Sequence, residues 1–203
     1  MINYILIFVI YLEYKEVLSM KIKNFFKHLN LVNKHRYLVF KLSIKAGIPF
    51  RGLVHDLSKY SPTEFLEGVK YFDGKISPIK VCKKKNGYSK AWLHHKGRNK
   101  HHFEYWYDFA APDKTPVMPY KYIVELICDT LAAGLVYKGK DWKQNSQIEY
   151  FENRKDLDYI NDNIKKVIRE VYQQVDKNGI DKTITKSNLK NIYYKYVNEN
   201  SIK

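Results

Sequence analysis

Residues 120–137 read YKYIVELICDTLAAGLVY, a strongly apolar segment that follows the proline-rich residues 112–119. The apolar character of this segment predicts a buried helix. Asp129 lies well inside it. A carboxylate that is buried without a partner costs several kcal/mol, so Asp129 needs a cation, a metal ion or strong hydrogen-bond donors beside it.

Apolar residues recur at helical spacing in several other segments. Gly47 and Pro49 end the first of them, and Ser61-Pro62-Thr63-Glu64 has the pattern of a capping box that begins another. The predicted helices span residues 21–46, 62–71, 89–109 with a break near Gly97, 120–137, 156–176 and 185–199, with a short apolar segment at 53–60 and a surface loop at 73–88. Because no segment alternates long enough to make a strand, we predict an all-α fold.

The sequence indicates three parts. Residues 1–19 are either a doubtful N-terminal extension, since Met20 begins a more ordinary start, or a short helix packed on the domain. Residues 20–140 form the predicted helical domain. Residues 141–203 form a C-terminal helical extension, which we expect to pack on the domain or on a second subunit in a homodimer.

The net charge of +15 suggests a polyanionic partner. However, 31 of the 36 basic residues are Lys and only 5 are Arg. Proteins that read bases rely on Arg, whose planar guanidinium makes bidentate contacts that Lys cannot make. Specific nucleic-acid binding is therefore disfavoured, and we expect the charge to attract a small phosphorylated molecule. A hydrophobic fraction of 45% excludes global disorder.

The cysteines and the apolar N-terminal residues give information about the cellular location of the protein. Cys82 and Cys128 lie far apart and neither belongs to a CxxC pair, so we predict neither a disulfide framework nor a Cys-based zinc site. The apolar residues 5–12 are too few to span a bilayer and lack the basic flank of a secretory signal. These features predict a cytoplasmic protein with no membrane partner.

Histidine is the residue type whose placement carries the functional argument. His35 falls on the apolar stripe of the helix at 21–46, where a lone histidine is often a hydrogen-bonded core residue. His55 and Asp56 are adjacent, and on a helix they point about 100° apart, so one ion between them could be reached by both. With His35 and Asp129 they make a predicted set of two imidazoles and two carboxylates. Such a set suits Mn²⁺, Fe²⁺, Co²⁺, Ni²⁺ or Zn²⁺ better than Mg²⁺.

A second block of histidines follows. His95, Asn99 and His102 have the spacing i, i+4 and i+7 of one helical face, unless the intervening glycine breaks the register. With His101, these two histidines are candidate ligands of a second ion. In the pair His94-His95, we expect His94 to lie at the surface or to contact a metal-binding residue without binding the ion itself.

The order His35, His55-Asp56, Asp129 resembles the HD superfamily of metal-dependent phosphohydrolases, an all-α family named after its His-Asp doublet. The run His55-Asp56-Leu57-Ser58-Lys59 is similar to the His-Asp-Ile-Gly-Lys run that is common there. Asp129-Thr130-Leu131-Ala132-Ala133 looks like the last metal-binding helix of that superfamily. The resemblance covers residues 21–138 and implies an HD-domain-like helical bundle with a C-terminal helical appendage.

Residues 94–106 resemble a small uncharacterised HD-like family of bacteria and their phages. The wider order of His, His-Asp, His, His-His and Asp also resembles HD subclasses with two or three metals, such as the HD-GYP cyclic-dinucleotide phosphodiesterases. The Gly-Tyr-Pro signature is absent here, and the interval between His95 and His101 is shorter than in that subclass. The resemblance thus implies one or two divalent transition-metal ions.

The function that the resemblance implies is a metal-dependent phosphohydrolase, either a phosphatase or a phosphodiesterase. In this mechanism a metal-bound hydroxide attacks the phosphate ester of a nucleotide or a related small molecule. Asp56 would hold the metal and orient its water. Lys59 would neutralise a phosphoryl oxygen in the transition state.

Further residues have expected roles around the same reaction. Glu64 and Glu104 are candidates for proton transfer or for support of the ligands, although Glu64 is equally explained as the capping-box acid. His101 or His102 could protonate the leaving group instead of binding a second ion. The candidate substrate-binding residues are Lys59, Arg98 and Asn99.

Two other functions stay open at the level of sequence. Some HD-like proteins hold two irons in a similar arrangement and are oxygenases, so the histidine-rich block also permits an oxidation. A non-enzymatic protein could instead use its basic charge and its many Tyr residues to bind nucleic acid along a groove.

Overall fold

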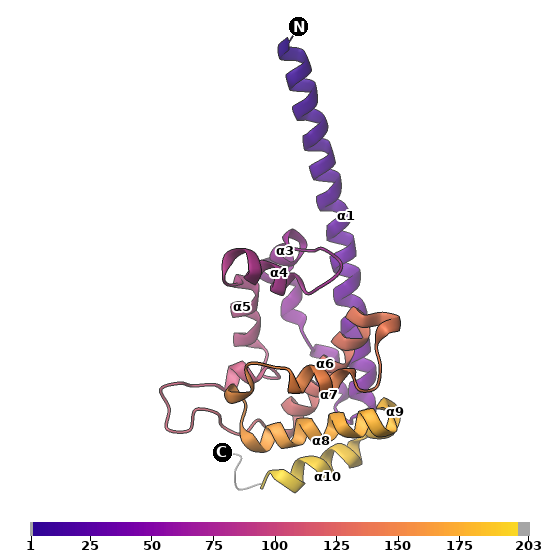
Figure 1. The fold of residues 1–203 in the computed structure, drawn as a ribbon, viewed down its shortest axis with the longest axis vertical. Helices are drawn as coiled ribbons and strands as arrows, with labels where there is room; N and C mark the ends of the chain where they lie inside the picture. The colour runs from indigo at the N-terminus through magenta and orange to yellow at the C-terminus, as the bar shows by residue number, and fades with distance from the viewer. Residues whose placement is uncertain (1, 199–203) are drawn as a thin grey trace. The chain divides into compact units, whose positions relative to one another are not determined.

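The computed structural model describes residues 2–198, with side chains from Lys21 to Asn198. Every regular element in this range is a helix and none is a strand, which confirms the predicted all-α fold (Figure 1). Within the same range, no helix has both the length and the apolar character that a membrane span requires.

Contacts divide the chain into two units. The first contains the residues up to Asn33 together with residues 59–94, and the second contains residues 34–58 and those from His95 onward. Three elements belong partly to each unit: α1 (Ile2–Lys45), η1 (Leu57–Tyr60) and α5 (Lys90–Arg98).

In the first unit, α3 (Pro62–Lys70) packs against α1 through aromatic rings. Phe65 lies with its ring centroid 5.0 Å from that of Phe25 and 5.1 Å from that of His28. Gly68 permits this approach, because a Cβ atom at this position would lie 2.2 Å from Nε2 of His28. The Ser61 hydroxyl accepts a hydrogen bond from the backbone N–H of Glu64, which confirms the N-cap of the predicted capping box.

The predicted surface loop at 73–88 is wrong, because the first unit contains α4 (Pro78–Asn86). Proline at the first position and Gly87 at the C-cap, with a φ of 80°, are ordinary signals for such a helix. Only Pro78 and Cys82 of α4 are buried. A buried stripe that is so narrow leaves no sustained hydrophobic period in the sequence.

In the second unit, the predicted helix at 120–137 is confirmed as α6 (Tyr120–Lys138). It packs in one core with the Lys34–Lys45 part of α1, with α8 (Asp162–Asn178) and with α10 (Lys186–Tyr196). The remaining elements are α2 (Pro49–Val54), η2 (Phe103–Trp106), η3 (Gly139–Asp141), α7 (Ser146–Glu152), η4 (Leu157–Tyr159) and α9 (Ile180–Thr183).

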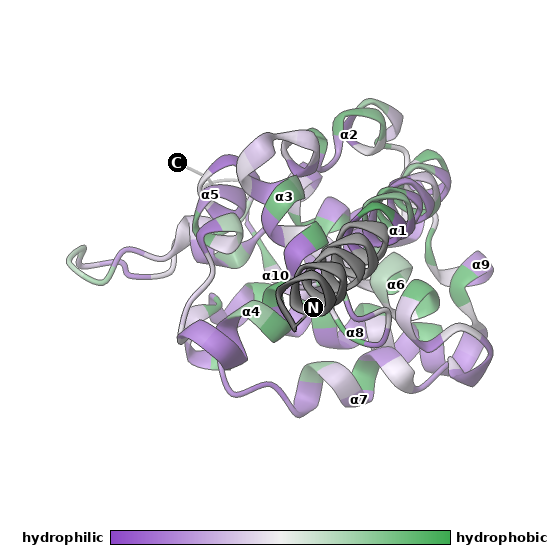
Figure 2. Cartoon of the chain, turned by 90° about the horizontal axis from the view of Figure 1, so that it is seen from above, coloured by the Kyte–Doolittle hydropathy of each residue, from purple (hydrophilic) through white to green (hydrophobic). Residues whose placement is uncertain are grey.

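The helices after Asp141 share this core with α6 rather than forming a core of their own. Figure 1 shows α8 and α10 side by side, and residues of α8 also contact α7. In Figure 2, α7 carries both hydrophilic and hydrophobic residues, as expected for a helix with Phe151 buried and Tyr150 exposed. The predicted helix at 156–176 begins later than expected, because Asn161 accepts the capping hydrogen bond of α8.

The N-terminal residues do not form a separate short helix. Residues 2–19 continue the helix at 21–46 without a break, so that both belong to α1. The predicted helix at 185–199 corresponds to α10, and residue 199 lies outside the described range.

Candidate metal centre

The His-Asp doublet lies at a break between two helices rather than on one. α2 ends at Val54, His55 has φ −54° and ψ 130°, and Asp56 has a φ of 54°. Asp56 is the only non-glycine residue with a positive φ in the described chain. The expectation that His55 and Asp56 project from one helix is therefore wrong, and the turn between them aims both side chains at one place.

Arg36 of α1 holds this turn by its backbone. Its Nε donates a hydrogen bond of 2.8 Å to the carbonyl oxygen of His55, and its Nη2 donates one of 2.9 Å to that of Leu53. These charge-assisted hydrogen bonds satisfy carbonyls at the end of a helix that has only six residues. They offset the conformational cost of the left-handed Asp56, which is about 1–2 kcal/mol for an ordinary residue.

One group of potential ligands consists of His35, His55, Asp56 and Asp129. Nε2 of His35 lies 2.9 Å from Oδ1 of Asp129, and Nε2 of His55 lies 3.6 Å from the same oxygen. Each residue offers one ligand atom, and these atoms all lie within 4.8 Å of one another. The structure thus brings together the four residues of the first predicted ligand set.

A second group consists of Asp56, His95, His101 and His102. Oδ1 of Asp56 lies 3.3 Å from Nε2 of His95 and 3.5 Å from Nε2 of His101. The other carboxylate oxygen, Oδ2, lies 3.4 Å from Nε2 of His55. Asp56 therefore belongs to both groups, and each of its two oxygens faces a different one.

Glu125, which is fully buried on α6, was not among the predicted site residues. Its Oε1 lies 3.0 Å from Nδ1 of His55 and 3.2 Å from Nδ1 of His101. Its Oε2 accepts a hydrogen bond of 2.7 Å from Nε of Arg51 on α2 and forms an ion pair with Nη2 of the same residue at 2.6 Å. The signal in the sequence was a second acid one helical turn before Asp129, on the same face of an apolar helix.

His95 is held from behind by neutral groups. Its Nδ1 lies 3.2 Å from the hydroxyl of Ser58, and the same hydroxyl accepts a hydrogen bond of 2.9 Å from the amide of Asn99. The Asn99 amide also donates to the carbonyl oxygen of His95 at 2.8 Å. Both amide hydrogens of Asn99 are thus engaged within the protein, which favours support of His95 over the predicted contact with substrate.

The predicted single helical face at 95–102 is wrong in its register. α5 ends at Arg98, and His101 and His102 lie in the turn before η2. The rings of these two histidines have centroids 4.2 Å apart. The turn, rather than a continuous helix, brings them into one group with His95.

The carboxylates and imidazoles of the cluster shift one another's pKa values. Burial lowers the pKa of His55, but the neighbouring carboxylates of Asp56, Asp129 and Glu125 outweigh it and raise this pKa well above 6.5. Burial raises the pKa of Glu125, but the imidazoles of His101 and His55 bring it down to about 2. The pKa of Asp129 is likewise held well below its usual range by His35 and His55, against the effect of burial.

His102 differs from His55 in its protonation. Burial lowers its pKa well below 6.5, and the charges of His101 and His95 lower it further. A neutral imidazole is the form that binds a metal ion. The cluster therefore combines a neutral His102 with imidazoles and carboxylates that lie at ion-pair distance from one another.

The other predicted site residues do not belong to these ligand groups. Lys59 and Glu64 lie in the first unit, where Oε1 of Glu64 is 2.6 Å from Nδ1 of His94. His94 is thus engaged by a buried acid. Arg98 is exposed at the end of α5, and Glu104 lies in η2. Their expected catalytic and substrate-binding roles stay predictions.

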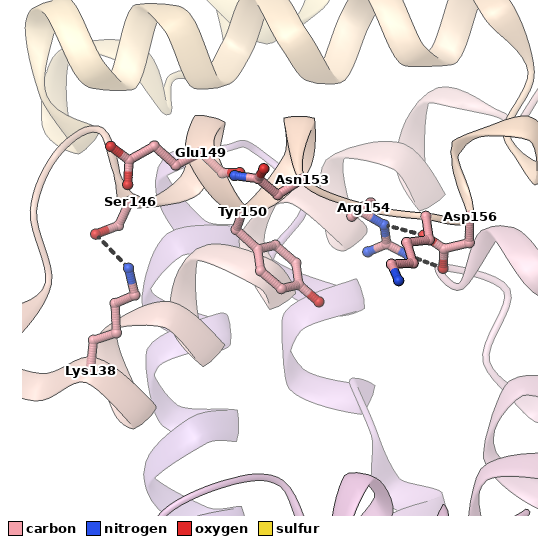
Figure 3. Close-up of a pocket in the computed structure, with 8 residues that line it drawn as sticks. Lys138, Ser146, Glu149, Tyr150, Asn153, Arg154 and Asp156 are labelled. Carbon is pink, nitrogen blue, oxygen red and sulfur yellow. Dashed lines mark hydrogen bonds and ion pairs between the residues drawn. The ribbon is translucent and has the colours of Figure 1, made fainter.

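A surface pocket of about 590 Å³ lies elsewhere in the second unit (Figure 3). It is lined by Lys138, Ser146, Glu149, Tyr150, Asn153, Arg154, Lys155 and Asp156. Lys138 donates to the Ser146 hydroxyl, and Arg154 makes two hydrogen bonds to Asp156. Because none of the clustered histidines lines this pocket and two of its cations already have partners, it is not the candidate site.

Comparisons with known proteins give a family but no activity. Residues 24–174 match the model of a family of unknown function, DUF5662. No curated protein matches the chain, and no solved structure does. The matched range includes both ligand groups and Glu125. Since the match covers about three quarters of the 203 residues, the chain belongs to the DUF5662 family.

Proposed function

We propose that this protein is a metal-dependent phosphohydrolase of the HD type whose centre binds two divalent transition-metal ions. The observation that carries this proposal is the position of Asp56 between the two ligand groups. A carboxylate that presents one oxygen to each of two groups is suited to bridge two ions. The two ions would then act on one phosphate ester.

The donor atoms fit such ions. His35, His55 and Asp129 would hold one ion, and His95, His101 and His102 the other, with Asp56 shared. Imidazole-rich sets with a few carboxylates favour Mn²⁺, Fe²⁺, Co²⁺, Ni²⁺ or Zn²⁺ over oxygen-seeking Mg²⁺ or Ca²⁺. Bound ions would polarise a phosphoryl oxygen and acidify a coordinated water.

The charge of the cluster supports an anionic substrate. Asp56, Asp129 and Glu125 contribute three negative charges and Arg51 one positive charge, a sum of −2. Two divalent ions bring this sum to +2. A doubly charged phosphate monoester would restore neutrality, and the +15 charge of the chain would draw it from solution. We therefore propose a nucleotide or a related small phosphate ester as substrate.

The two free cysteines bear on where the protein acts. Cys82 and Cys128 are both buried thiols without a disulfide. Free thiols are typical of a reducing compartment. We therefore propose a cytoplasmic location.

A di-iron oxygenase is the second candidate function. The observation in its favour is the second ligand group, in which three histidines accompany one shared carboxylate. Imidazole is a common ligand of iron as well as of the other transition metals. The resemblance to HD-like proteins permits both chemistries.

Metal analysis of the purified chain tests the proposal. We expect two ions per chain, and then hydrolysis of nucleotides or cyclic nucleotides in a screen with Mn²⁺, Fe²⁺, Co²⁺ and Ni²⁺. The Asp129→Ala variant should lose both metal and activity. The matched control is Asp181→Ala, since Asp181 is an exposed acid that pairs with Lys45.

The outcomes separate the candidate functions. A protein that takes up no divalent ion overturns the metal centre altogether. Two irons with an oxygen-sensitive absorption band, and no phosphatase activity, would favour the oxygenase. Salt-dependent nucleic-acid binding that survives the double change His55→Ala and Asp56→Ala, without metal-dependent activity in the unchanged chain, would favour the basic binding protein.

A further inference from the structure

We propose that Glu125 is a positioning residue that orients one histidine ligand in each of the two metal groups. The inference rests on the proposed metal centre and adds a link between its halves. His55 belongs to the group with His35 and Asp129, whereas His101 belongs to the other group. The same oxygen of Glu125 faces both of these imidazoles.

Both oxygens of the Glu125 carboxylate face nitrogen atoms of other side chains. An ionised carboxylate accepts about four hydrogen bonds and donates none. Nε of Arg51 donates a hydrogen bond of 2.7 Å to Oε2, and Nη2 of Arg51 forms an ion pair with the same oxygen at 2.6 Å. Oε1 is left for Nδ1 of His55 at 3.0 Å and for Nδ1 of His101 at 3.2 Å. Nδ1 of His55 donates a hydrogen bond to Oε1, whereas Nδ1 of His101 lies at ion-pair distance from the same oxygen without hydrogen-bond geometry.

A third ion between His55, His101 and Glu125 is a less economical explanation of the same atoms. Their ligand atoms do lie within 4.8 Å of one another. However, an ion there would need the Nδ1 lone pairs of two imidazoles that already present Nε2 to the other groups. It would also compete with the guanidinium of Arg51 for the carboxylate. Glu125 therefore acts as the acceptor behind two ligands and not as a ligand itself.

Glu125 favours the same tautomer in both histidines, because a carboxylate oxygen beside Nδ1 stabilises a proton on that nitrogen. With the proton held on Nδ1, the lone pair of each ring is on Nε2, the atom that faces Asp56 at 3.4 Å in His55 and at 3.5 Å in His101. A carboxylate behind a metal-binding histidine fixes its orientation and increases its basicity. Because one carboxylate serves both rings, its loss should weaken the binding of both ions.

His95 provides an internal contrast. Its Nδ1 meets the neutral hydroxyl of Ser58, which in turn accepts from Asn99. This support reaches one ligand of the second group only. A change at Ser58 should therefore affect one ion, whereas a change at Glu125 should affect both.

The test compares Glu125→Gln with Ser58→Ala in the full chain, using Co²⁺ as the probe. Glutamine keeps the size of the side chain, but with its oxygen toward the imidazoles its NH₂ group faces the Arg51 donors. We expect the affinities of both Co²⁺ ions to fall about tenfold to hundredfold in Glu125→Gln. Ser58→Ala should weaken one ion and leave the other within about twofold. The Co²⁺ absorption spectrum should change at both sites in the first variant and at one site in the second.

Controls separate positioning from loss of structure. Glu170→Gln removes an acid of α8 that accepts hydrogen bonds from Lys195 and Tyr196, and should leave both Co²⁺ affinities unchanged. Circular dichroism of each metal-free variant checks the fold. If Glu125→Gln does not fold, Arg51→Lys keeps the carboxylate and the positive charge but loses the guanidinium fork, and it should weaken both ions to a smaller and similar extent.

The possible failures are distinguishable. Two Co²⁺ ions bound with unchanged affinity by Glu125→Gln, or by Arg51→Lys where the first variant does not fold, would overturn the role of Glu125 and leave the metal centre standing. Loss of only one ion would also overturn the link between the two groups. An unchanged chain that binds no Co²⁺ would overturn the proposed function and this inference together.

Discussion

Asp56 and His95 approach each other across the cluster, with Oδ1 of Asp56 3.3 Å from Nε2 of His95. They come from different elements, the turn after α2 and the helix α5. This relationship places the His-Asp doublet in contact with the histidine-rich block. It is the reason why a single carboxylate could serve two ions.

The left-handed backbone of Asp56 allows a test that separates binding from folding. Asp56→Asn should abolish binding of both ions, because the amide carries no negative charge, while asparagine tolerates the φ of 54°. Asp56→Ala should also lose metal and be less stable than Asp56→Asn by about 1 kcal/mol, since alanine does not favour this conformation. Elemental analysis and urea unfolding measure the two effects. Retention of two ions by Asp56→Asn would contradict the bridging role.

Arg36 should contribute to stability and to metal binding through the backbone. Arg36→Lys cannot donate to the carbonyl oxygens of His55 and Leu53 with the same geometry. We expect a loss of about 1–3 kcal/mol in the free energy of unfolding, with a weaker affinity for Co²⁺. The control is Arg169→Lys, an exposed partner of Glu152, which should cost less than about 1 kcal/mol. Equal effects of the two changes would argue against a special contribution of the Arg36 hydrogen bonds to the turn at His55.

Gly52 sets the distance between α2 and α1. A Cβ at Gly52 would lie 2.5 Å from Cβ of Ser43 and 3.0 Å from Cα of Phe40, so Gly52→Ala must push the two helices apart. We expect a loss of about 1–3 kcal/mol, measured by denaturant unfolding. Gly97→Ala is the matched control, because nothing lies within 4 Å of a Cβ there, and it should stabilise α5 by about 0.5–1 kcal/mol. If Gly52→Ala leaves the free energy of unfolding unchanged, α1 and α2 do not pack as closely at this position as described.

His28 predicts a pH dependence in the first unit. Burial, helped by the charge of Lys59, lowers its pKa from 6.5 to about 4. Between these values the unfolded chain binds more protons, so stability should fall as the pH drops from above 6.5 to about 4. The difference between the two pKa values limits this loss in the free energy of unfolding to about 3 kcal/mol. Urea unfolding measured across this pH range should show that the free energy of unfolding falls less in His28→Met than in the unchanged chain. If stability depends on pH in the same way in both proteins, His28 is not the group responsible.

The helices with a strong hydrophobic period were predictable from the sequence, and the element with a weak one was not. α6 was predicted to within a residue, because its apolar residues are buried on most of its circumference. α4 was predicted as a loop, because only two of its residues are buried. The spacing of apolar residues reflects which face of a helix is buried, so a helix with few buried residues shows no clear hydrophobic period.

The candidate ligands were predictable as residue types in order along the chain. His35, His55-Asp56 and Asp129 were proposed together, with the later histidines as a second set, and the structure places them in two groups that share Asp56. Glu125 was overlooked, because a glutamate in a helix has no feature in the sequence that marks it as buried behind a histidine. Only its neighbours in space show that it faces His55, His101 and Arg51.

The sequence by itself determined the all-α class, the central apolar helix and the residue types that could bind a metal. These depend on hydrophobic period and on side-chain chemistry, which are local properties of the chain. The tertiary structure alone decided that Asp56 adopts a left-handed turn, that its two oxygens face different histidines and that Glu125 faces one imidazole in each group. These relationships join residues far apart in the chain, and packing rather than local preference sets the distances between them.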